Sequence, residues 1–200
     1  MVAAHLAQGG LLAYPTETVY GLGSRVVARD LAALAALTDR PRNKPFLALM
    51  AGKKMVRDSS LVFTAAAERL ASSFWPGPLT LVLAGGESMF PDELRGEQGG
   101  IAVRWSSHTE TNRLIEFLEM PISSTSANVS GREPLQDAAG ILAEFAGPVD
   151  AGNLLVLDGG RLATVSSSTL VDCTSSQPTV LREGAVSWRQ IMECLEEVGE

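Results

Sequence analysis

The segment from Phe74 to Leu83 reads FWPGPLTLVL and joins a predicted helix to a predicted strand. Proline inside a helix removes a backbone hydrogen bond, so the helix that starts near Thr64 is expected to end before Pro76. Gly77 and Pro78 then turn the chain into the apolar run at 79–83, which has the composition of a buried strand. A direct change from helix to buried strand is typical of an α/β protein.

Further runs of the same kinds extend this interpretation in both directions along the chain. Asp30 is expected to cap one helix, and Ser107 with Glu110 and Ser187 with Gln190 match the capping-box pattern of two others. Strands are predicted at 11–14, 46–50, 79–83, 101–105, 154–158, 168–172 and 179–182, with several of them buried on both faces. The sequence therefore predicts an α/β sheet with flanking helices, whose ligand site lies on loops at strand ends.

Domain organisation and composition narrow the class of protein. No internal repeat or linker is visible, so we expect one domain over residues 1–200 and no additional C-terminal domain. No window approaches the roughly 18 apolar residues of a membrane span, and a cytoplasmic protein is expected. Cys173 and Cys194 lie far apart without C-x-x-C spacing, which predicts two core thiols and no zinc site.

Charge is unevenly distributed along the chain. The net charge of -7 argues against a protein that binds nucleic acid by neutralising phosphates. However, the segment from Arg40 to Arg57 carries six basic residues and no acidic one. A local basic segment in an acidic chain favours a small anionic ligand over a long polyanion.

Four polar segments stand out against the predicted scaffold. They are YPTETVYGLG (14–23), DRPRNKPF (39–46), AVRW (102–105) with Arg104 at the end of a strand, and PISSTSANVSGREP (121–134) together with VSSSTLVD and LREG. Each has a plain structural explanation: the first is a Gly-containing turn, the second a solvated basic loop carrying Arg40, Arg42 and Lys44. Arg104 needs a negative partner, which could be a ligand carboxylate or a structural Asp or Glu.

Several familiar catalytic patterns are absent from the sequence. There is no P-loop, no dinucleotide-binding glycine pattern and no nucleophile elbow, and neither His5 nor His108 has an obvious Ser or Cys partner. The remaining set is rich in neutral donors and arginine and poor in acid–base groups. Such a set suits phosphoryl or nucleotidyl transfer, which depends on positioning and on charge stabilisation.

Taken in order, PTETVYGLG, RPRNKP, FWPGPLTLVL, AVR, STSANVSG, STLVD and LREG resemble the YrdC-like family of threonylcarbamoyl-AMP synthases, from about Leu11 to Ile191. This resemblance implies a twisted mixed α/β sheet with a large concave cavity. It also implies synthesis of L-threonylcarbamoyladenylate and pyrophosphate from L-threonine, bicarbonate or CO2, and ATP, with Mg2+ on the phosphates. The product would serve the t6A modification of tRNA through a transient encounter with the threonylcarbamoyl transferase complex.

The resemblance also assigns residues by matching position. Threonine would be held by Thr16, Thr18, Arg104 and Ser168, and ATP by Arg40, Lys44, Ser124, Ser126, Asn128 and Arg182. Of these, Arg40, Lys44, Ser126 and Asn128 would act in the reaction itself. No protein side chain is assigned to a metal.

The sequence departs from the family pattern at two positions. Thr38 stands where a lysine is usual two residues before Arg40, and Pro134 stands where some members carry a serine. Losing one charge-assisted contact could cost about 1.5–3 kcal/mol of phosphate stabilisation. Two alternatives therefore stay open: a paralogue that acts on another carbamoyl acceptor, and an RNA-binding module without catalysis. The acidic total and the aromatic content of 6% do not favour RNA binding.

Overall fold

A mixed β-sheet runs the length of the molecule. The computed structural model describes residues 1–41, 43–163 and 165–196. Strands pair in the order β10-β9-β5-β6-β3-β7-β2-β1-β8, and β4 pairs with β5 off this path. Their bounds are β1 (Leu11–Tyr14), β2 (Gly21–Gly23), β3 (Leu47–Leu49), β4 (Leu61–Val62), β5 (Leu79–Gly85), β6 (Ile101–Arg104), β7 (Ile122–Ser126), β8 (Leu154–Val156), β9 (Thr169–Asp172) and β10 (Thr179–Arg182).

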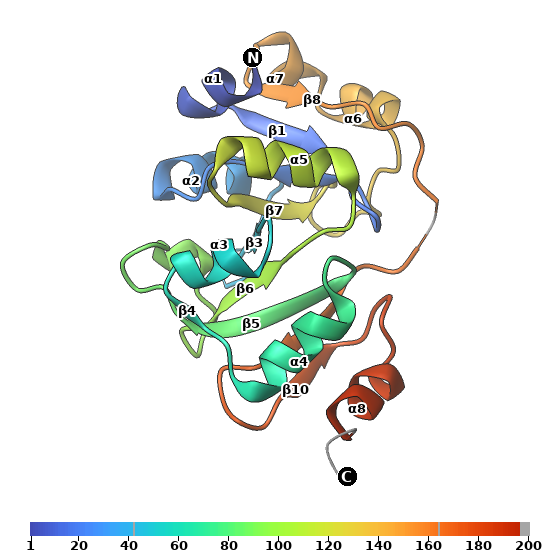
Figure 1. Ribbon diagram of the computed structural model, residues 1–200. Coiled ribbons are helices and arrows are strands. Elements are labelled where there is room, and N and C mark those ends of the chain that lie inside the picture. Colours follow the sequence, from blue (N-terminus) through green and yellow to red (C-terminus); the bar gives the residue numbers. More distant parts are fainter. Residues whose placement is uncertain (42, 164, 197–200) are drawn as a thin grey trace.

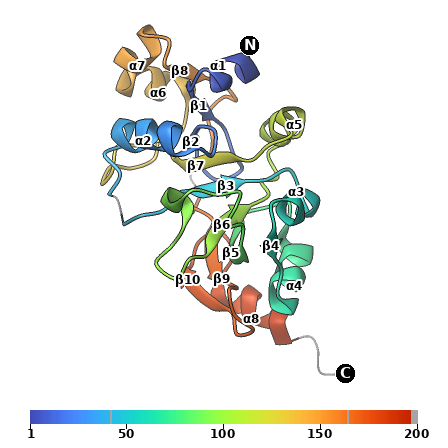
Figure 2. The same ribbon diagram turned by 90° about the vertical axis from the view of Figure 1, so that its left-hand side faces the viewer.

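Helices cover the sheet at both ends and on both sides. They are α1 (Val2–Ala7), α2 (Ala28–Leu37), α3 (Lys53–Asp58), α4 (Ala65–Phe74), α5 (Thr109–Leu118), α6 (Ala138–Glu144), α7 (Ala146–Asp150) and α8 (Trp188–Glu196), with a 3-10 turn at Asp92–Leu94. Helices α1 and α7 lie beside β8, whereas α4 and α8 lie at the β10 end (Figure 1). Figure 2 shows α2 and α5 on opposite sides of the sheet. The predicted α/β class with a twisted mixed sheet is confirmed.

The pleat of the central strands divides core from cavity. Leu81 on β5 pairs with Val103 on β6, and both are fully buried in the main apolar core. Their neighbours Val82 and Ala102, which also pair with each other, point the other way and line a cavity. Because side chains alternate along a strand, one face of these strands supplies the core and the other supplies a binding surface.

Strand β1 is apolar because both of its faces are buried. It is buried along its whole length, and its residues divide between two apolar clusters. Leu11 and Ala13 pack in the main cluster, whereas Leu12 and Tyr14 pack with Ile115 of α5 in the second. The prediction of strands buried on both faces is confirmed for β1 and does not hold for β5 and β6, whose second face lines the cavity.

The helix–strand switch at FWPGPLTLVL is confirmed. Helix α4 begins after Thr64, whose hydroxyl accepts a hydrogen bond from the backbone N–H of Ala67, and it ends at Phe74. The chain reaches β5 through a cis Trp75–Pro76 peptide bond. The capping box of α8 is also confirmed, because the backbone N–H of Ser187 donates to Gln190 Oε1 and the backbone N–H of Gln190 donates to Ser187 Oγ.

Three local predictions are wrong. Asp30 does not cap α2: the helix starts earlier, and the buried Asp30 carboxylate pairs with Arg25 and Arg29 at 2.8 Å each. Ser107 does not cap α5, whose N-cap position is His108. The glycines at 21–23 form strand β2 between β1 and β7 instead of a turn. Ion pairing decides the role of Asp30 and strand pairing that of residues 21–23, and local patterns encode neither.

The two cysteines are core thiols, as the sequence predicts. Cys173 and Cys194 are both buried free thiols. Burial raises the pKa of Cys173 to about 12. A search of the described residues for a helix long and apolar enough to cross a membrane finds none.

Strand β2 provides a test of packing. A Cβ on Gly23 would lie 2.1 Å from the carbonyl oxygen of Ser123 on the neighbouring strand, a distance that the backbone cannot accommodate. We expect Gly23→Ala to lower the free energy of unfolding by about 3 kcal/mol or more in urea denaturation. Gly147→Ala is the matched control, because nothing lies within 4 Å of its Cβ and alanine favours the helix. Equal stability of the two variants would contradict this account of the sheet.

Candidate active site

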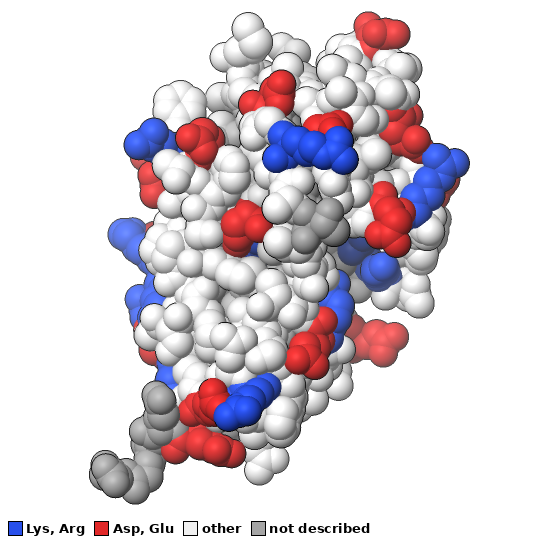
Figure 3. All heavy atoms as spheres, turned by 90° about the vertical axis from the view of Figure 1, so that its right-hand side faces the viewer, with Lys and Arg blue, Asp and Glu red and all other residues white. Residues whose placement is uncertain are grey.

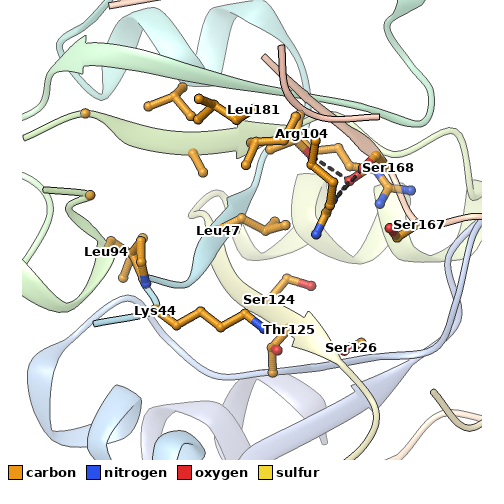
Figure 4. Close-up of a pocket in the computed structure, with 18 of the residues that line it drawn as sticks. Lys44, Leu47, Leu94, Arg104, Ser124, Thr125, Ser126, Ser167, Ser168 and Leu181 are labelled. Carbon is orange, nitrogen blue, oxygen red and sulfur yellow. Dashed lines mark hydrogen bonds between the residues drawn. The ribbon is translucent and has the colours of Figure 1, made fainter. Parts of the chain in front are cut away.

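A cavity of about 600 Å³ opens on the face of the sheet opposite the main core. Its floor comes from strands β3, β5, β6, β7 and β9, and its walls come from the segments after β1, around Arg40 to Pro45, around Gly96 to Gly100, and at Ser167 and Ser168. Figure 4 shows Arg104 and Ser168 on one side, with Ser124, Thr125 and Lys44 on the other. This volume fits a drug-sized or nucleotide-sized ligand.

Arg104 is the charged group buried deepest in this cavity. Its residue is 5% exposed, at the end of β6, and its Nη2 lies 2.6 Å from Glu17 Oε1. Nη2 also donates to Thr18 Oγ1 at 3.1 Å, and Nε donates to the carbonyl oxygen of Gly77 at 3.3 Å. Within the described residues Nη1 has no hydrogen-bond partner. A guanidinium has five N–H donors, so the two on Nη1 remain for a ligand.

The two threonine hydroxyls next to Arg104 have fixed directions. Thr16 Oγ1 donates to the carbonyl oxygen of Val19 at 2.7 Å, so in its 3.0 Å contact with Thr18 Oγ1 it must be the acceptor. Thr16 Oγ1 also accepts from the backbone N–H groups of Thr18 and Val19 at 3.2 Å each, and Thr18 Oγ1 accepts from Arg104. One lone pair of Thr18 remains. The pair Arg104 and Thr18 thus offers a donor to an anionic group and an acceptor to a neighbouring N–H or O–H.

Glu17 is a site residue that the sequence analysis missed. Its Oε2 accepts a hydrogen bond from the Ser106 hydroxyl, and its Oε1 faces Arg104. Burial by itself would raise the pKa of Glu17, but the charge of Arg104 and the hydrogen bond from Ser106 outweigh burial and lower that pKa. The signal was available, because a buried Arg104 requires an acid and Glu17 lies inside the PTET motif.

Ser168 links two strands and a second arginine. Its Oγ lies 2.8 Å from Thr80 Oγ1 on β5, and its carbonyl oxygen accepts from Arg182 Nη2 at 2.8 Å. Partial burial, followed by the nearby charge of Arg104, lowers the pKa of Arg182. The two guanidinium groups therefore share one anion-attracting region.

Arg40 holds its own loop against the sheet. It donates from Nε to the carbonyl of Lys44 at 2.7 Å, from Nη2 to the carbonyl of Pro45 at 2.6 Å, and from Nη1 to Thr125 Oγ1 at 2.8 Å. Its guanidinium also stacks over Phe46, 4.5 Å from the ring centre. Burial lowers the pKa of Arg40 to about 10, so it stays charged at neutral pH. Two of its five N–H donors remain for a ligand.

The rest of the basic segment divides into two parts. Lys44 lines the cavity, whereas Lys53 and Arg57 pair with Glu68, and Lys54 pairs with Asp58. Arg42 lies outside the described residues. Among the described residues, the cations that line the cavity are therefore Arg40, Lys44, Arg104 and Arg182.

The hydroxyl run of PISSTSANVSGREP is largely a strand. Ser124 and Ser126 lie on β7 and line the cavity. Ser123 points the other way and bonds to Ser24, with 2.9 Å between the two Oγ atoms. The donor-rich stretch therefore serves both the sheet and the cavity.

Asn128 is the one predicted site residue that is absent from the described cavity lining. Its Nδ2 donates to the carbonyls of Val129 and Arg132 at 2.9 Å each, and so holds the loop after β7. Its Oδ1 is buried without a hydrogen-bond partner in the described part of the chain. Contact of Asn128 with ATP stays a prediction. The other nine predicted residues, Thr16, Thr18, Arg40, Lys44, Arg104, Ser124, Ser126, Ser168 and Arg182, meet at the cavity.

The two departures from the family pattern occupy different places. Thr38 is buried at the C-terminal end of α2, and its hydroxyl donates to the carbonyl of Leu34 at 2.9 Å. It does not belong to the described cavity lining, whereas Pro134 does. Thr38 therefore completes a helix end in this chain.

Comparisons with known proteins agree with this geometry. The sequence model of the Sua5/YciO/YrdC family, described as "Telomere recombination", matches residues 4–184. Threonylcarbamoyl-AMP synthase of Pyrococcus abyssi is 33% identical over 199 residues, which is 99% of this chain and 57% of that protein. The Chromobacterium violaceum enzyme of the same name is 33% identical over 173 residues, 86% of each chain.

A solved structure is similar throughout the described fold. The crystal structure of P. abyssi Sua5 complexed with L-threonine has a TM-score of 0.87 at 33% identity and covers 98% of this chain and 56% of that one. The chain thus spans a little over half the length of the archaeal relative.

The pair of Glu17 and Arg104 predicts a pH-dependent stability. Because the folded pKa of Glu17 lies below its ordinary value of 4.5, its ionised form stabilises the fold above pH 4.5, and this is lost as pH falls through the lowered value. We expect Glu17→Gln to lower the free energy of unfolding by about 3 kcal/mol at pH 7, and by much less at a pH below the lowered pKa.

Urea denaturation at both pH values measures the difference. Glu87→Gln removes an exposed carboxylate and serves as the control, with little effect at either pH. A loss in Glu17→Gln that stays constant with pH would show that the carboxylate charge is not what matters.

Proposed function

The chain belongs to the Sua5/YciO/YrdC family, and we propose that it is an L-threonylcarbamoyladenylate synthase. The reaction would convert L-threonine, bicarbonate or CO2, and ATP into threonylcarbamoyl-AMP and pyrophosphate. The observation that carries the proposal is one cavity that joins the donor–acceptor pair of Arg104 and Thr18 to the cations Arg40, Lys44 and Arg182. The family relatives named for this activity, and the relative that binds L-threonine, support it.

The threonine end of the cavity would be the Arg104 side. The free Nη1 of Arg104 would bind the substrate carboxylate, and the open lone pair of Thr18 would accept from the hydroxyl or the amino group of the substrate. Thr16 would act through Thr18, because its own hydroxyl is committed to Val19. Ser168, whose carbonyl oxygen accepts a hydrogen bond from Arg182, would be a further residue at the threonine end.

The nucleotide end would be the Arg40 side. Two unused N–H donors of Arg40, the ammonium of Lys44 and the hydroxyls of Ser124 and Ser126 would hold phosphate oxygens. Arg182 would stand between the two ends. Contact of Asn128 with ATP would require its side chain to move, because both its amide protons are already donated and its Oδ1 is buried.

The chemistry would proceed by positioning and charge stabilisation. The threonine amine would capture CO2 as a carbamate and release a proton to water. A carbamate oxygen would then attack the α-phosphorus, and the bond to pyrophosphate would break. Arg40, Lys44 and Arg182 would stabilise the negative charge that passes to pyrophosphate. Among the described lining residues there is no histidine, so these cations are the groups available for that role.

Magnesium would arrive with the nucleotide. The described residues contain no group of three His, Cys, Asp or Glu side chains that could form a protein cage for a metal. Mg2+ commonly binds through substrate phosphates with few protein ligands, which fits this cavity. When bound, it would neutralise phosphate charge beside Arg40 and Lys44.

The product would be consumed by a threonylcarbamoyl transferase that acts on tRNA, in the cytoplasm, after a transient encounter. Direct RNA binding is not favoured. Acidic and basic side chains are mixed on the face in Figure 3, which therefore lacks a continuous basic surface for a polyanion.

Pyrophosphate release tests the activity. The protein is incubated with ATP and bicarbonate and with each amino acid in turn, and we expect release that depends on L-threonine. Release with another acceptor would support a paralogue with different specificity. Absence of nucleotide turnover together with salt-sensitive RNA binding would contradict the enzyme proposal.

Kinetic constants of two variants test the division of the cavity. We expect Arg104→Ala to raise the KM for threonine by about 100-fold and the KM for ATP by less than about threefold, since a charge-assisted contact contributes roughly 3 kcal/mol. Lys44→Ala should show the reverse preference, with a smaller effect. Equal changes in both KM values for Arg104→Ala would refute the assignment of threonine to that end.

A further inference from the structure

The pair of Glu17 and Ser106 lies behind the proposed threonine site. Glu17 is not part of the described cavity lining, although Thr16 and Thr18 on either side of it are. Its side chain is 18% exposed, and Ser106 is 1% exposed. Neither residue belongs to the described cavity lining, so an effect on the ligand would pass through Arg104.

The neighbours of Arg104 decide which of its donors remain available. A carboxylate usually binds a guanidinium with two parallel bonds, from Nε and Nη2 or from Nη1 and Nη2. Here Nη2 lies 2.6 Å from Glu17 Oε1 in an ion pair and donates to Thr18 Oγ1, and Nε donates to the carbonyl oxygen of Gly77. Neither bidentate arrangement is therefore available, and a ligand carboxylate can bind Arg104 only through Nη1.

Glu17 also offsets the charge of Arg104. The ion pair of 2.6 Å places a negative charge directly against the guanidinium on the side away from the cavity. Without it, Arg104 and the neighbouring Arg182 would present two uncompensated charges to the ligand. Such a pocket would attract any carboxylate, whatever other groups that carboxylate carried.

We propose that Glu17 is a positioning residue that makes this pocket selective for amino acids over simple carboxylates. By pairing with Arg104 and offsetting its charge, Glu17 weakens the binding of a simple carboxylate, which is a monoanion, whereas an amino acid is a zwitterion with no net charge and can also donate to Thr18. The proposal rests on the proposed function, because it takes the Arg104 end of the cavity as the amino-acid site.

Binding of butanoate to the full chain tests the proposal, with isothermal titration calorimetry as the measurement. Butanoate has the carboxylate and carbon chain of threonine but neither its amino group nor its hydroxyl. In Glu17→Gln we expect the Kd for butanoate to fall at least about tenfold relative to the unsubstituted protein, and the Kd for threonine to change less than about threefold. An unchanged or higher Kd for butanoate, or binding too weak to measure in both proteins, would overturn the proposal.

Two further variants separate charge from packing. Ser106→Ala removes the hydrogen bond to Glu17 but retains its charge, so the butanoate Kd should stay within about twofold of the unsubstituted protein. An equal fall in Ser106→Ala and Glu17→Gln would overturn the proposal in favour of local packing. Should Glu17→Gln fail to fold, Glu17→Asp takes its place, because the shorter side chain moves the carboxylate away from Arg104 by one methylene. This variant must then lower the butanoate Kd at least threefold.

The same titrations keep the two proposals distinct. Failure of the unsubstituted protein to bind threonine would contradict the proposed function, whereas the change in butanoate affinity on loss of Glu17 would still decide the role of Glu17.

Discussion

The charge of Arg104 must be compensated inside the protein, and much of the site follows from that requirement. A guanidinium cannot lose its proton at neutral pH, so a buried arginine needs a negative partner and acceptors for its N–H groups. The chain meets this need with Glu17, Thr18 and the carbonyl of Gly77, which come from two segments far apart in sequence. The PTET segment and the turn after α4 are thereby held at the end of β6, where a ligand can reach the donors that remain.

The pleat of the sheet determines where the other side chains of the cavity lie. Alternate residues of β5 and β6 enter the core, and their neighbours line a cavity, so packing in the core fixes the positions of the lining side chains. Hydroxyl groups on β7 and the arginine loop that binds Thr125 close the opposite side. A site mounted on paired strands in this way is preorganised before any ligand arrives, which suits a reaction that depends on positioning more than on acid–base catalysis.

Thr38 shows how a departure from a family pattern can be absorbed locally. The family lysine would add a cation near the phosphates, whereas Thr38 is buried and bonds to the end of its own helix. Four other cations in the described chain line the cavity, and Lys44 is an exposed one that can move toward a ligand. A missing lysine at this position therefore does not leave the cavity without positive charge.

The sequence by itself determined the α/β class, the end of α4 before Pro76, the capping box of α8, and nine residues that meet at the cavity. These follow from local rules of helix capping, proline geometry and apolar runs, and from motifs whose order along the chain is specific. Only the tertiary structure decided that glycines 21–23 form a strand, that Asp30 pairs with two arginines, and that Glu17 is the partner of Arg104. Strand pairing and ion pairing join residues distant in sequence, and the free energy of those contacts outweighs local propensity.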